Sequence, residues 1–115
     1  MKSVLILVTG DPRVSSRPAE AVRIAAGVGV WGKVRITLYL RGAATRILRE
    51  DVEDLADGDQ FTRHLPLLGE RGRTLLVQQG AVAEVDRGSL SLSIVEIDDR
   101  ELARLVAAAH HVWRF

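Results

Sequence analysis

Four residues that follow the first apolar run have side chains suited to anion binding. Asp11, Ser15, Ser16 and Arg17 come after the run 4–8 and stand at the start of a predicted helix. Hydroxyls, a guanidinium and the N–H groups of a helix N-terminus can together hold a phosphate or a carboxylate. The same residue types also cap helices, because the first turn leaves N–H groups without partners. A capped, solvated loop is the simpler interpretation, and an anion site is the alternative.

A glycine-rich segment matches two nucleotide-binding motifs by its letters. Residues 27–32 read G-x-G-x-x-G, and with Lys33 they read G-x-x-x-x-G-K. In nucleotide sites such glycines follow a strand and open a helix. Here they close a predicted helix, and Val34 stands where a magnesium-binding Ser or Thr belongs. We interpret the glycines as close backbone packing at a helix end, with a glycine stop.

The remaining reactive residue types do not form a catalytic or metal-binding pattern. The chain has no cysteine, which excludes disulfides, thiolate nucleophiles and cysteine metal sites. His110 and His111 are adjacent and would point to opposite sides of a strand, and His64 stands alone. We interpret His110 as a helix-end histidine facing the dipole. The sequence therefore predicts no catalytic residue, no metal site and no cofactor.

Two further groups have ordinary structural interpretations. The acidic residues between positions 50 and 54 fit the solvated face of a helix. Trp113 and Phe115 fit either core positions or anchors of a subunit contact, since a terminal aromatic strand suits both. The sequence does not decide between the two.

The elements that must position these residues follow from the spacing of apolar residues and turn residues. We expect a broken helical turn or loop at 61–68, because Pro66 interrupts that segment. Asp98, with Glu101 three residues later, predicts the capped start of the last helix. The other expected elements are strands at 4–8, 34–40, 74–78, 90–97 and 111–115, helices at 18–31 and 43–56, and one helical turn at 80–85.

This alternating order predicts an α/β fold, a three-layer sandwich with a mostly parallel five-stranded sheet in a single domain spanning 1–115. In such sheets ligands bind outside the carboxyl ends of the strands, where the strand order reverses. The segments expected there are 9–17, 41–43 and 78–81. The candidate ligand-binding residues are therefore Asp11, Ser15, Ser16, Arg17, Arg41, Gln78 and Gln79.

Segments spread over most of the chain resemble the DsrE/DsrF-like superfamily, which includes the TusBCD sulfur-relay subunits. The resemblance rests on RPAEAVRIAA at 17–26, on Gly32, on LYLRGAA at 38–44, and on the closing segments 94–98, 101–105 and 111–115. It implies a flavodoxin-like fold and assembly into dimers, trimers or hexamers.

For active members the resemblance also implies a cysteine that carries persulfide sulfur. That cysteine would fall where this chain has Gln78, Gln79, Gly80 and Ala81. A glutamine amide has no nucleophilic sulfur and cannot form a persulfide. The resemblance therefore implies a relative that does not carry sulfur.

The net charge and the length of the apolar runs limit the classes of partner that the sequence predicts. Sixteen basic and fifteen acidic residues leave a formal net charge of +1, which predicts neither a nucleic-acid nor a membrane partner. No run approaches the roughly 20 apolar residues of a membrane span, so we expect a cytoplasmic protein. Our first hypothesis is a non-catalytic DsrE-like binding or scaffold subunit that assembles with itself or with related DsrE-like subunits. The alternative is an enzyme or sensor that binds a small anion or nucleotide at the strand carboxyl ends.

Overall fold

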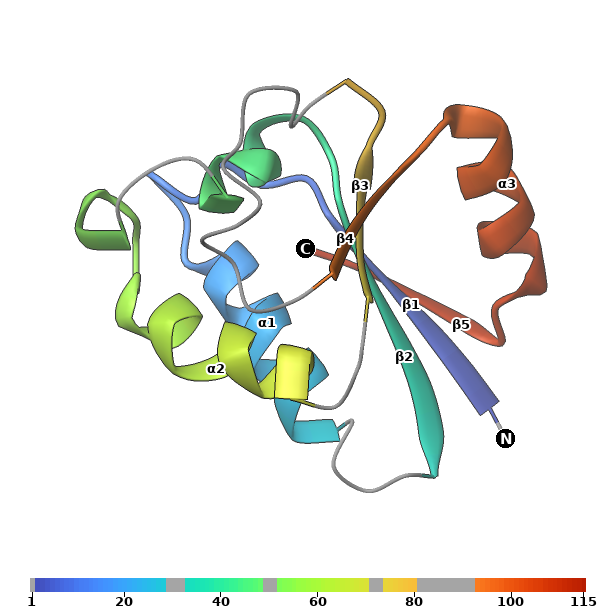
Figure 1. The fold of residues 1–115 in the computed structure, drawn as a ribbon, viewed down its shortest axis with the longest axis horizontal. Helices are drawn as coiled ribbons and strands as arrows, with labels where there is room; N and C mark the ends of the chain where they lie inside the picture. The colour runs from blue at the N-terminus through green and yellow to red at the C-terminus, as the bar shows by residue number, and fades with distance from the viewer. Residues whose placement is uncertain (1, 29–32, 49–51, 71–73, 81–92) are drawn as a thin grey trace.

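Five parallel strands form one sheet in the computed structural model, which describes residues 2–28, 33–48, 52–70, 74–80 and 93–115 (Figure 1). The strand order is β4-β3-β2-β1-β5. The second, third and fourth strands are therefore added in order on one side of the first strand, and the last strand pairs with its other side. The strands are β1 (Lys2–Val8), β2 (Val34–Leu40), β3 (Thr74–Gln78), β4 (Ser93–Ile97) and β5 (His111–Arg114).

Helices lie on both faces of this sheet (Figure 1). One face carries α1 (Arg17–Val28), α2 (Asp59–Glu70) and the 3₁₀ helices η2 (Gly42–Leu48) and η3 (Val52–Asp54). The other carries α3 (Asp99–Ala108), which connects β4 to β5 across the sheet. The predicted three-layer α/β architecture is confirmed.

The first strand shows why a continuous apolar run is needed. Val4, Ile6 and Val8 belong to the large core under α1 and α2. Leu5 and Leu7 point the opposite way and pack with the apolar face of α3. Because successive side chains of a strand alternate between faces, a strand covered on both sides must be apolar at every position.

The second helix corrects the prediction of a broken helical turn or loop at 61–68. Residues 59–70 form α2 with Pro66 inside it. Phe61 and Leu68 are buried in the main core, and Leu65 packs against it. The free energy gained by burying this apolar face against α1 exceeds the cost of the backbone hydrogen bond that the proline removes. The helix therefore continues past Pro66.

Replacing Pro66 with Ala should therefore stabilise the protein by about 1–2 kcal/mol. The side chain is exposed, and a proline inside a helix is about 3 kcal/mol less favourable than alanine. The greater freedom of alanine in the unfolded chain offsets part of that gain. Urea denaturation measures the change. In a loop the same substitution would lower stability slightly, so a loss would contradict a helix at 59–70.

The predicted helix at 43–56 is also corrected, because the described residues of this segment form η2 and η3 instead. The Thr45 hydroxyl donates to the carbonyl oxygen of Gly42 at 2.7 Å. The hydroxyl therefore bonds to the backbone of its own helical turn, as Thr side chains commonly do. Ile47 and Leu48 are nonetheless buried in the core, as the apolar stripe predicted.

Several boundaries agree with the sequence. The strand predicted at 74–78 is β3, and α1 is described as far as Val28. Residues 29–32 and 81–92 lie outside the described residues. Of the helical turn predicted at 80–85, only Gly80 is described, and it lies in a turn with φ of 83°. The interpretation of close packing is wrong at Gly27, because a Cβ there would meet nothing within 4 Å.

The last helix begins as predicted. The Asp98 carboxylate accepts a hydrogen bond from the Glu101 N–H at 2.8 Å, which is an N-cap. The Glu101 side chain bonds Arg104 instead of completing a capping box. Beyond the helix, Nδ1 of His110 accepts a hydrogen bond from the Ser3 N–H at 3.0 Å. His110 therefore ties the end of α3 to the start of β1.

Candidate functional site

The loop after β1 is held by its own side chains. The Asp11 carboxylate accepts from the Arg13 N–H at 3.0 Å and forms an ion pair with the Arg13 guanidinium at 3.0 Å. These hydrogen bonds hold the pKa of Asp11 below its ordinary value. The carboxylate is therefore engaged within a short turn.

The two serines act as caps. The Ser15 hydroxyl accepts from the Arg17 N–H at 3.2 Å. The Ser16 carbonyl accepts the Glu20 N–H at 3.0 Å and so begins the backbone bonding of α1. The contacts of both residues match the capped loop that the sequence favoured.

Arg17 joins this loop to the carboxyl end of β5, the strand beside β1. Its guanidinium donates to the Arg114 carbonyl at 2.9 Å and lies over the Phe115 ring, 5.2 Å from the centroid. Phe115 in turn donates its N–H to the Leu7 carbonyl at 2.8 Å and accepts from the Gly10 N–H at 3.3 Å. These contacts sit where the strand order reverses between β1 and β5. Arg17 and Phe115 are therefore bonded to each other's elements at the point where the sequence predicts a ligand, and that ligand site stays a prediction.

A second group lies at the carboxyl end of β2. Arg41 donates to the Asp99 carboxylate at 2.7 Å and to the Tyr39 hydroxyl at 3.2 Å. The Asp99 carboxylate and then the Tyr39 hydroxyl hold the pKa of Arg41 above its ordinary value, and Arg41 holds the pKa of Asp99 below its own. Tyr39 is fully buried against α3, so this cluster joins β2 to the first turn of α3.

The ion pair predicts an acid response. Because the folded pKa of Asp99 lies below its ordinary 3.8, its contribution to stability is present above that value and is lost as the pH falls through the lowered pKa. From neutral pH to about pH 3, the melting temperature of the wild type should therefore fall further than that of Asp99→Asn. An Arg41→Gln variant removes the guanidinium that lowers the pKa of Asp99. The melting temperature of this variant should therefore fall with pH as much as that of the double variant that also carries Asp99→Asn. An equal acid loss in the wild type and Asp99→Asn would contradict the pairing.

The two glutamines stand at the carboxyl end of β3. The Gln78 side chain accepts a hydrogen bond from the Gly42 N–H at 2.9 Å. Gln79 donates its backbone N–H to the Ile97 carbonyl at 3.0 Å, and the residue is exposed. The segments 41–43 and 78–80 therefore meet at one edge of the sheet, as parallel pairing predicts.

The described contacts hold six of the seven candidate residues in two groups, and the seventh, Gln79, is bonded to Ile97 through its backbone N–H. Asp11, Ser15, Ser16 and Arg17 are bonded within the first loop and to β5. Arg41 and Gln78 bond to α3 and to the start of η2. Sequence reasoning missed Tyr39 and Asp99. Tyr39 could have been found from its position two residues before Arg41, on the same face of the strand.

The described residues contain no group of three or more His, Asp or Glu side chains able to hold a metal ion. Within the same part of the chain, none of the helices is both long and apolar enough to cross a membrane.

Comparison with known proteins bears on the fold. The structure is similar to the crystal structure of the YchN protein from E. coli, with a TM-score of 0.78 and 18% sequence identity over 100% of each chain. No family model and no curated protein matches the sequence. Because the identity is below 25%, this likeness shows the fold alone: the chain shares the three-layer α/β fold of that protein, as the sequence predicts.

Proposed function

We propose that this chain is a non-catalytic DsrE-like subunit that works by holding other subunits and carries no persulfide itself. The carboxyl end of β3 supports this proposal most. The family resemblance expects a sulfur-carrying cysteine there, and this chain has Gln78 and Gln79. The Gln78 amide accepts the Gly42 N–H at 2.9 Å, so it contributes a structural bond between two loops. One residue of the segment in which the resemblance expects the thiol thus has a structural contact.

The subunit contact that we propose is centred on Trp113. This residue lies on β5, one of the two edge strands of the described sheet, and is 39% exposed. Trp113 is paired in register with Ile6 of the neighbouring strand β1. The Ile6 side chain is fully buried, so on this row of the sheet the side chain becomes exposed only at β5. Phe115 instead packs against the main core. Large aromatic side chains are enriched among the residues that dominate the energy of interfaces.

The occupant that we propose for this edge is a second copy of the chain. Edge strands present unpaired backbone groups and are covered or paired in most proteins. Closed assemblies of identical subunits are the commonest oligomers, and the two-fold dimer leads among them. The dimers and hexamers that the resemblance implies both accommodate such a contact.

Light scattering coupled to size-exclusion chromatography tests the proposal. At micromolar concentration the protein should elute with a mass of two or more times the 12.6 kDa of one chain. A strictly monomeric protein over this range would contradict a scaffold built from copies of this chain.

A further inference from the structure

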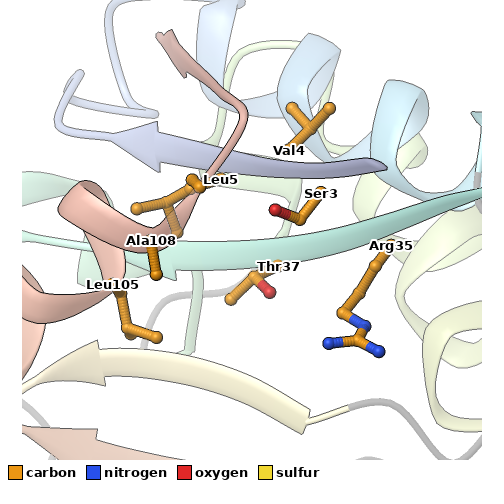
Figure 2. A pocket seen from close by; sticks show the side chains of 8 residues that line it. Ser3, Val4, Leu5, Arg35, Thr37, Leu105 and Ala108 are labelled. Atoms are coloured by element: carbon orange, nitrogen blue, oxygen red, sulfur yellow. The ribbon is translucent and has the colours of Figure 1, made fainter. Parts of the chain in front are cut away.

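A hollow of about 170 Å³ lies between α3 and strands β1 and β2 (Figure 2). It is at the amino-terminal edge of the sheet, opposite the edge at which sequence reasoning expected a ligand. Ser3 lines it from the start of β1, and Arg35 and Thr37 line it from the first half of β2. Leu105 and Ala108 close it from the last turns of α3.

The alternation of strand residues explains why polar groups line this hollow. Ser3 and Leu5 are two residues apart on β1 and so share a face of the sheet, the face that packs on α3. Register pairs Ser3 with Arg35 and Leu5 with Thr37, which places the four side chains side by side. Figure 2 shows Arg35 and Thr37 on the same side of β2 as Leu105 and Ala108.

The polar groups of the hollow differ in what already engages them. The Ser3 hydroxyl lies 3.1 Å from Nδ1 of His110 and is held by it. Within the described part of the chain, neither the Arg35 guanidinium nor the Thr37 hydroxyl takes part in a hydrogen bond or ion pair. None of the described residues that line the hollow is acidic. The free polar side chains among these residues are therefore one guanidinium and one hydroxyl, which suit an anionic group.

The remaining wall is apolar and its size limits the ligand. Leu5 is buried, Leu105 is half-buried, and the Ala108 methyl lies beside them. In another protein, an engineered apolar cavity of about 150 Å³ binds benzene, a molecule of six non-hydrogen atoms. A ligand with a charged end and about four carbon atoms matches both the volume and the walls.

We propose that this hollow binds a small organic carboxylate with a short apolar tail. The carboxylate accepts hydrogen bonds from the Arg35 guanidinium and the Thr37 hydroxyl. The tail packs against Leu5, Leu105 and Ala108. This site is separate from the residues of the proposed function, so either proposal can fail without the other.

Titration of butyrate into the full-length protein, followed by methyl NMR, tests the proposal. The methyl signals of Leu5, Leu105 and Ala108 should shift together and saturate with a dissociation constant in the millimolar range. Arg35→Gln should weaken binding about tenfold, because it removes a charge-assisted hydrogen bond. Arg100→Gln changes the net charge equally at the other end of α3 and should leave the dissociation constant unchanged.

Two further arms separate a carboxylate site from other sites. Butanol should bind about tenfold more weakly than butyrate, since it lacks the charged end. Ala108→Leu should fill the hollow and abolish the saturable shift, while the dispersion of the remaining signals reports that the variant is folded.

Three results would overturn the proposal. The first is a shift that does not saturate or that spreads over the whole surface. The second is equal binding by Arg35→Gln and Arg100→Gln. The third is displacement of butyrate by an equal concentration of inorganic phosphate, which would assign the hollow to a simple inorganic anion instead.

Discussion

Replacing Trp113 with Ala should convert the assembled protein into a folded monomer at micromolar concentration. Truncation of an aromatic residue at the centre of an interface costs about 2 kcal/mol or more, which corresponds to roughly a 30-fold rise in the dissociation constant. Because Trp113 is 39% exposed on an edge strand, its loss should leave most of the core packing in place. Sedimentation velocity over a dilution series measures the shift, and circular dichroism reports that the monomer is folded.

Val14 provides the matched control for this experiment. It is an exposed apolar residue, at 83%, and it lies in the loop after β1. Val14→Ala should therefore leave the dissociation constant unchanged. If Trp113→Ala sedimented like the wild type at every concentration, the contact between copies would not involve β5.

Replacing Phe61 with Ala should lower the free energy of unfolding by about 3–5 kcal/mol. Phe61 is 1% exposed and is one of the largest side chains fully buried in the core. It anchors α2 against α1, which lies beside it (Figure 1). Its truncation removes a large apolar area from the core and leaves a cavity that the backbone can only partly fill.

Leu67 on the same helix is the control, because it is 37% exposed. Leu67→Ala should cost less than about 1 kcal/mol. Urea denaturation of both variants at one protein concentration gives the comparison, since assembly adds stability by mass action. A loss at Phe61 no larger than that at Leu67 would mean that residues 59–70 do not pack as a helix on the core.

Most of the sheet was predictable from the sequence because most of its strands are short runs rich in apolar residues and bounded by turn residues; β5, with the sequence HVWR, is not such a run. Residues 4–8 contribute side chains to the hydrophobic clusters on both faces of the sheet, so all five must be apolar. An uninterrupted apolar run of this kind can be recognised in the sequence alone. The helix α2 was not predictable in the same way. Pro66 is a local signal that opposes a helix, and the packing that overrides it involves α1, far away in the sequence.

The candidate site shows the same limit. The rule that strands end at a common edge correctly brought Gly42 and Gln78 together. It could not show that Asp99, 58 residues from Arg41 along the chain, would pair with that guanidinium. The same rule predicts ligands at the carboxyl ends of the strands, whereas the hollow lies at their amino-terminal ends. Its residues on β1 and β2 become neighbours only through the register of these two strands.

The reactivity of a single introduced cysteine tests the account most directly, because the chain has no cysteine of its own. His111 is exposed and lies two residues before Trp113 on β5. In the assembled protein, His111→Cys should react slowly with a maleimide, and the added Trp113→Ala change should restore fast labelling. Val14→Cys should react at the same rate in both backgrounds. Equal labelling of the cysteine at position 111 with and without Trp113 would show that no copy covers this edge.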